Sequence, residues 1–194
     1  MSVDPLYLFV FIGLFTPGPN VVLLSAAAAS AGFRATLPHL SGVVLGVGVV
    51  AAATALGVDA VLQAATWSID LMRVGAAAWI LYLAWRMAAA TRAGKAKVGA
   101  RPFGFFEALL FQWANPKLWA IAIAAVAGFG GELSPGQESF RLGLAFSGIN
   151  IGVCLFWTLG GSLLGRLMSS EAHWRIFMLT MAGGLAASAG AIFI

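Results

Sequence analysis

Apolar residues fill most of this chain in long stretches, and short polar connectors separate them. Six stretches predict six helices, at residues 5–31, 40–63, 72–91, 106–128, 141–165 and 175–194. Each is close to the ~20 residues that cross about 30 Å of hydrocarbon. Backbone groups in lipid must be hydrogen-bonded within the chain, and the alternating pattern of a membrane barrel is absent. We therefore expect an all-α membrane bundle.

The composition supports this class. Hydrophobic residues make up 61% of the 194 residues and charged residues only 9%, whereas soluble domains carry roughly 25% charged residues. We expect one transmembrane domain spanning 1–194, with the lipid bilayer as its surroundings. The net charge of +4 is typical of cytoplasmic loops in such a protein, so no nucleic-acid partner is expected.

Basic residues divide unevenly between the two sides of the predicted bundle. The connectors after the first, third and fifth helices hold seven of them: Arg34, Arg92, Lys95, Lys97, Arg101, Arg166 and Arg175. The other side holds Arg73 and Arg141, with several acidic residues nearby. Because the more basic side stays in the cytoplasm, both termini are predicted outside. No basic region precedes the first apolar run, so a cleaved signal peptide is not expected.

The segment TPGPN at 16–20 interrupts the first apolar stretch. Pro17 and Pro19 lack backbone N–H groups, so a continuous helix would leave the carbonyls of Gly13 and Phe15 without partners. Gly18 eases a non-helical turn between the prolines. We expect two half-helices here, the second starting near Pro19.

Such a break places polar groups inside the membrane. The half-helix after Pro19, with Asn20 beside it, presents free N–H groups and a partial positive charge that suit a carboxylate. The fourth stretch has its own break at ANPK, where Pro116 frees the carbonyl of Gln112. Lys117 then lies near mid-span, where a charge is costly and usually functional.

The two breaks together predict one substrate site. Its donors, acceptors and cation suit a zwitterion with a carboxylate and an amine. The expected substrate-binding residues are Pro17, Gly18, Pro19, Asn20, Asn115, Pro116 and Lys117.

A weak internal repeat accompanies the breaks. Gly42 and Gly46 form a GxxxG pattern, as do Gly148 and Gly152, and we expect all four to allow close helix packing. The halves, roughly 1–91 and 106–194, are joined by a basic cytoplasmic loop at 92–105. Three helices per half make the repeat inverted, with broken helices 1 and 4, which is typical of secondary transporters working by alternating access. The four glycines could pack helices within one chain or between two chains, so a homodimer stays an alternative to a monomer.

Several segments resemble the LysE/RhtB amino-acid exporters: TPGPN, GFR at 32–34 with the first glycine pair, RVGAAAWILYLAWRM at 73–87 and FFEALLFQWANPK at 105–117. The resemblance covers the whole chain. It implies export of amino acids or related metabolites across the bacterial inner membrane, driven by a proton or ion gradient. The chain departs from the family at Ala84, where glycine is frequent, and after NPK, where LWAIAIAAVAGFGG lacks the family's aromatic and proline-rich continuation.

Other classes fit less well. A membrane enzyme acting on lipid needs clustered carboxylates with a metal, or a nucleophile with a base, and a metal-cation exporter needs clustered soft or anionic ligands. Seven scattered acids, two separated histidines and one cysteine supply neither. No cofactor and no metal are therefore expected. A helical scaffold subunit stays as a further alternative, and it would tolerate changes at Lys117 that a carrier would not.

Overall fold

The computed structural model describes residues 4–57, 66–89, 101–130, 133–168 and 170–190, and all regular secondary structure in them is helical. The expected all-α fold is confirmed for these residues. The helices are α1 (Pro5–Phe15), α2 (Pro19–Ala31), α3 (Phe33–Ala55), α5 (Thr66–Ala88), α6 (Phe105–Phe111), the 3-10 turn η1 (Gln112–Ala114), α7 (Pro116–Phe129), α8 (Pro135–Leu167) and α9 (Glu171–Gly190). Most of the predicted basic loop at 92–105 lies outside the described residues.

Both predicted breaks are present as bends. The axes of α1 and α2 meet at 56°, and those of α6–η1 and α7 meet at 65°. Two of the described helices, α3 and α8, are long and apolar enough to cross a membrane alone, and the bent pairs raise this to four if each is one span. The six predicted spans and the inverted repeat stay predictions.

Local sequence sets the helix starts, and α3, α5, α8 and α9 begin four to seven residues earlier than predicted. α8 begins at Pro135 because Ser134 caps it: the Ser134 hydroxyl accepts from the Gln137 backbone N–H, and the Gln137 side chain accepts from Ser134 in return. α3 begins at Phe33, directly after Gly32, whose φ of +87° reverses the chain after α2. Glycine adopts this φ without the steric cost that other residues carry.

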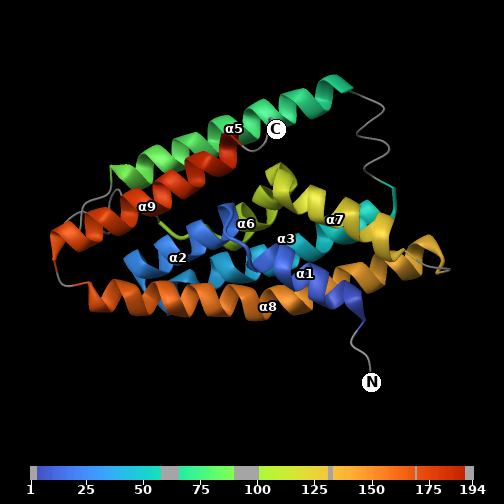
Figure 1. The fold of residues 1–194 in the computed structure, drawn as a ribbon, viewed down its shortest axis with the longest axis horizontal. Helices are drawn as coiled ribbons and strands as arrows, with labels where there is room; N and C mark the ends of the chain where they lie inside the picture. Colours follow the sequence, from blue (N-terminus) through green and yellow to red (C-terminus); the bar gives the residue numbers. More distant parts are fainter. Residues whose placement is uncertain (1–3, 58–65, 90–100, 131–132, 169, 191–194) are drawn as a thin grey trace.

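The helices of the two halves interleave (Figure 1). α3 and α8 pack against each other; α3 also contacts α6 and α7, whereas α8 contacts α1 and α2. α5 and α9 form a second pair, which meets the rest through α2 and η1. In Figure 1, α1–α2 and α5 run from right to left and α3 runs back, while α6–α7, α8 and α9 each run opposite to the corresponding element of the first half.

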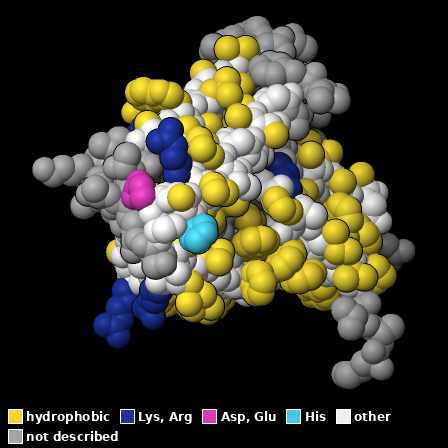
Figure 2. Space-filling model, turned by 60° about the vertical axis from the view of Figure 1, so that its left-hand side comes forward, with side chains coloured by type: hydrophobic (Ala, Val, Ile, Leu, Met, Phe, Trp, Pro, Cys, Tyr) yellow, Lys and Arg dark blue, Asp and Glu magenta, His cyan; other side chains and the backbone are white. Residues whose placement is uncertain are grey.

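Charged side chains lie near the two ends of this bundle. The left-hand end in Figure 1 brings together the end of α2, the starts of α3 and α9 and the ends of α5 and α8. These segments carry the basic residues Arg34, Arg86, Arg166 and Arg175. Figure 2 turns this end forward and shows separate basic side chains on a largely apolar surface. At the start of α8, Arg141 pairs with Glu138 at 2.8 Å and with Asp4 at 3.5 Å.

The first glycine pair packs as expected. A methyl group added at Gly42 would overlap the carbonyl oxygen of Phe105, and one at Gly46 would lie 2.7 Å from Cγ of Gln112. Both glycines therefore let α3 approach α6 closely.

The second expected pair does not pack within the chain. Gly148 and Gly152 are exposed, and an added methyl would have no atom within 4 Å at either position. A different pair on α8 takes this role: Gly161 and Gly165 lie against α2, where added methyls would be 2.7 Å from the Cα atoms of Ser25 and Ala29 respectively. Close packing of α8 within the chain thus involves a glycine pair farther along the helix, and for Gly148 and Gly152 packing between chains stays a prediction.

Alanine substitution separates these two glycine pairs. We expect Gly161→Ala to lower the melting temperature of the purified protein, because overpacking a close contact costs about 1–3 kcal/mol. Gly148→Ala should leave it unchanged or raise it, since alanine is intrinsically better in a helix than glycine by roughly 1 kcal/mol. Equal loss of stability in both variants would contradict this assignment.

Candidate functional site

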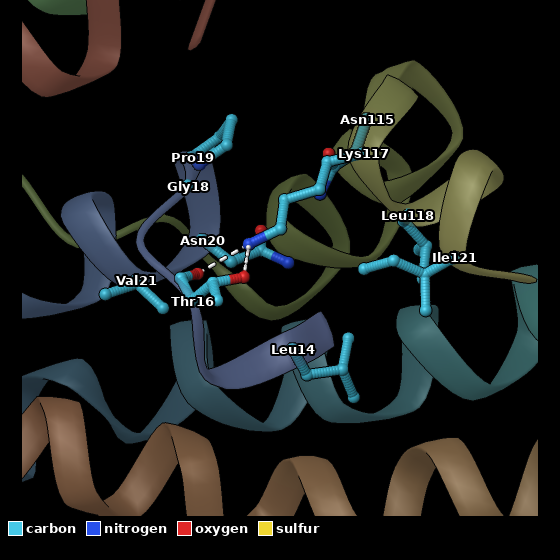
Figure 3. Close-up of a pocket in the computed structure, with 10 residues that line it drawn as sticks. All are labelled: Leu14, Thr16, Gly18, Pro19, Asn20, Val21, Asn115, Lys117, Leu118 and Ile121. Carbon is cyan, nitrogen blue, oxygen red and sulfur yellow. Dashed lines mark hydrogen bonds between the residues drawn. The ribbon is translucent and has the colours of Figure 1, made fainter. Parts of the chain in front are cut away.

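The two breaks meet in space (Figure 3). Lys117, in the first turn of α7, donates from Nζ to Oγ1 of Thr16 at 2.8 Å and to the Thr16 carbonyl oxygen. A third acceptor, the Pro17 carbonyl oxygen, is 3.5 Å away. Lys117 of the second bent pair therefore donates to backbone carbonyls that lie at the break of the first bent pair.

Two helix N-termini line the same pocket. α2 follows Gly18 and α7 follows Asn115, and neither N-terminus has a side-chain cap. Residues of both first turns line a pocket of about 20 Å³, which has room for roughly one water molecule. We call this space the break pocket. It combines two partial positive helix ends with the ammonium group of Lys117, an environment that favours an anionic group.

Gly18 makes room for the lysine. Its backbone is extended, with φ of −171°, so steric freedom of the backbone is not the reason for glycine here. A methyl group at this position would lie 2.9 Å from Cδ and 3.1 Å from Nζ of Lys117. The absence of a side chain lets Lys117 cross the break to reach Thr16.

The carbonyl groups at the first break differ from those predicted. α1 ends at Phe15 and the chain turns extended at Thr16, so Pro17 no longer lies in a continuing helix. The Thr16 hydroxyl folds back and donates to the Gly13 carbonyl oxygen at 2.9 Å. The carbonyls that Lys117 reaches are those of Thr16 and Pro17, one to two residues beyond the expected pair.

Gln112 is a central residue that the sequence interpretation considered only through its carbonyl. Its side chain is fully buried and exchanges two hydrogen bonds with Asn20: Nδ2 of Asn20 donates at 2.8 Å, and Nε2 of Gln112 donates back at 3.1 Å. Nε2 also donates to the Ala108 carbonyl oxygen at 2.9 Å. A glutamine four residues before a proline break, in an otherwise apolar run, is the sequence signal that could have identified it.

Asn115 leaves an acceptor free at the pocket. It is 3% exposed, its Nδ2 donates weakly to Gln112 at 3.4 Å, and its Oδ1 is buried without a hydrogen-bond partner. Buried polar atoms rarely stay unpaired in folded proteins. The break pocket thus offers both donors for a carboxylate and an acceptor for an N–H or O–H group. In the described part of the chain, no group of three or more His, Cys, Asp or Glu residues could hold a metal ion.

Known proteins match this chain over nearly its full length. The family model for LysE type translocators matches residues 11–193. This chain belongs to that family. Its members are transporters, so the chain is not an enzyme, and the resemblance to LysE-type exporters is confirmed.

Curated relatives carry a more specific name, cysteine/O-acetylserine efflux protein. One from Salmonella paratyphi A is 33% identical over 179 residues, covering 86% of this chain and 85% of the relative. One from Escherichia coli K12 is 32% identical over 167 residues, covering 82% of each. No solved structure matches the chain.

A double-mutant cycle tests the Asn20–Gln112 pair. We expect Asn20→Leu and Gln112→Met each to lower the free energy of unfolding by about 1–3 kcal/mol, because each leaves a buried amide short of partners. The double variant should cost less than the sum of the two, since it removes both amides together. Thermal or denaturant unfolding in detergent measures all four proteins; strictly additive losses would show that the two amides do not interact.

Proposed function

We propose that this protein exports a small zwitterionic amino acid from the cytoplasm and holds it in the break pocket. The observation that carries the proposal is the meeting of two uncapped helix N-termini, Lys117 and the free Oδ1 of Asn115 in one pocket. The substrate carboxylate would bind the helix ends of α2 and α7 together with Lys117.

Substrate binding would proceed by an exchange of partners. In the present structure the ammonium group of Lys117 occupies the carbonyls of Thr16 and Pro17, and the pocket is nearly filled. When the substrate arrives, its carboxylate draws Lys117 away, and its own ammonium group takes the vacated carbonyls and Oδ1 of Asn115. A charged pair of Lys117 and the substrate carboxylate would form while the substrate ammonium takes over the carbonyls, so no charge is left without a partner in the membrane, which would be costly.

The relatives favour a short, polar amino acid as substrate. Their names give cysteine and O-acetylserine as the exported molecules. Both molecules are small zwitterions, the class of ligand that suits the pocket. We propose that this chain transports the same class.

An inverted repeat would supply the transport cycle. In support, corresponding elements of the two halves run in opposite directions, and α3 and α8 each pack on the bent pair of the other half. On this proposal six spans cross the bacterial inner membrane, both termini lie outside, and the halves alternate access to the pocket. A proton or ion gradient would drive the cycle.

The decisive experiment measures efflux. Cells loaded with labelled cysteine or O-acetylserine should lose label faster with this protein than without it, and a protonophore should slow the loss if protons drive it. Lys117→Met should reduce the rate about tenfold or more, because it removes charge-assisted hydrogen bonds. Arg166→Gln, an exposed basic residue at the end of α8, is the matched control and should export normally. If no small amino acid leaves faster than from control cells, the proposed function is wrong.

A further inference from the structure

A second cavity lies apart from the break pocket, between α2, α3, α5 and the start of α6. We call it the inner cavity. Its volume is about 70 Å³, larger than that of the break pocket. Its polar lining consists of His39, Arg86, Arg101 and Glu107, and Leu83 and Met87 are among its apolar residues. Arg86 places it at the end of the bundle where basic side chains gather.

The charges around this cavity are not balanced. Arg101 pairs with Glu107 at 2.6 Å, and the other carboxylate oxygen of Glu107 accepts from the Gly104 N–H at 2.7 Å. Arg86 forms no ion pair with any described residue; its guanidinium lies 5.8 Å from the ring centroid of Tyr82. Among the described residues this guanidinium has no anionic partner, and a carboxylate-bearing ligand in the cavity that Arg86 lines would supply one.

His39 adds a second unpaired group. It is 2% exposed, its ring lies 4.9 Å from that of Phe103, and its Nδ1 is buried without a hydrogen-bond partner. Because buried ring nitrogens are normally hydrogen-bonded, this atom also indicates a missing polar ligand. Two residues that line the cavity, Arg86 and His39, therefore each carry a polar group that has no partner among the described residues and that a polar ligand could bind.

The inner cavity lies next to the break pocket along two helices. On α2, Leu23 lines the inner cavity, while Pro19, Asn20 and Val21 line the break pocket. In α6 and η1, Glu107 of the inner cavity precedes Gln112 by five residues. Five residues correspond to a rise of about 7.5 Å along a helix. The Asn20–Gln112 amide pair is thus positioned between the two spaces.

We propose that the inner cavity is a cytoplasmic waiting site for the exported amino acid, an inference that rests on the proposed function. Arg86 binds the carboxylate, Glu107 and Nδ1 of His39 receive the ammonium group, and the short side chain lies over Leu83 and Met87. The amino acid stays bound there while Lys117 keeps the break pocket closed. It moves on to the break pocket when the Asn20–Gln112 pair separates.

The test uses inside-out membrane vesicles, which present the cytoplasmic face to the medium, with uptake of labelled cysteine measured across concentrations under reducing conditions. Arg86→Gln and Glu107→Gln should each raise KM about tenfold or more with little change in maximal rate, as expected when a charged hydrogen bond to the ligand is lost. Glu107→Gln keeps an oxygen that can accept from Gly104, so the start of α6 is preserved. Arg86→Lys should restore part of the affinity, and Arg166→Gln is the control.

Binding to purified protein separates this site from the break pocket. In equilibrium dialysis with labelled cysteine, the double variant Lys117→Met/Arg86→Gln should bind about tenfold or more weakly than Lys117→Met alone, because the two proteins differ only at the inner cavity. Acetate and ethylamine should compete poorly, because each offers half of the zwitterion. If acetate competes as well as cysteine, the cavity is a general anion site and the proposal is wrong.

The outcomes distinguish the two proposals. Normal export with unchanged KM in both Arg86→Gln and Glu107→Gln overturns the waiting site and leaves the proposed function standing. If wild-type vesicles transport no amino acid, the proposed function fails. In that case dialysis tests whether the inner cavity binds cysteine. If no cysteine binds, or if Arg86→Gln in the Lys117→Met background does not weaken the binding, the waiting site is overturned too. Melting temperatures of all variants verify that they are folded.

Discussion

A helix that stops inside an apolar bundle leaves backbone groups that need hydrogen-bond partners, and the rest of this structure depends on how they find them. Each bent pair receives partners from the other. Lys117 of α7 binds the carbonyls between α1 and α2, and Asn20 of α2 binds the side chain at the end of α6. The backbone of the first break thus depends on the other bent pair, since unpaired backbone groups cost several kcal/mol in an apolar medium. At the second break the Gln112 carbonyl accepts from the Asn115 N–H, and the two bent pairs meet there through the Asn20 and Gln112 side chains.

The groups that hold the breaks together are also the ones that suit the substrate. The ammonium group of Lys117 already binds the Thr16 and Pro17 carbonyls, so a ligand ammonium would meet acceptors that are already arranged to bind such a group. The helix ends of α2 and α7 remain uncapped by side chains, which keeps their partial positive charge available for a carboxylate. On the proposed function the substrate would exchange with Lys117 at acceptors that already exist, and the pocket of about 20 Å³ would have to widen to hold an amino acid.

How much of this could be read from the sequence depends on how local each feature is. The two breaks and their bending follow from proline chemistry within a few residues, whereas glycine is needed at position 18 because the distant Lys117 side chain crosses there. The α8 start was missed because hydropathy does not register the Ser134–Gln137 cap. The glycines of α8 that pack within the chain could not be identified from the sequence, because spacing alone does not say which face of a helix is covered. Thirteen residues separate Gly148 from Gly161, a rotation of about 220° at 100° per residue, so the two positions lie on different faces.

The partner of Gln112 lies 92 residues away, and no local rule connects them; yet this pair sets how the halves move on the proposed cycle. It is neutral and reciprocal, and it lies between the break pocket and the inner cavity. Separating two amides costs less than separating a buried ion pair, because no net charge is left without a partner. A passing zwitterion offers both donors and acceptors, so it can take up the amide groups as they part. A neutral amide pair at this point therefore suits a barrier that must open and close in every transport cycle, whereas the charged Lys117 contact suits the step that selects the substrate.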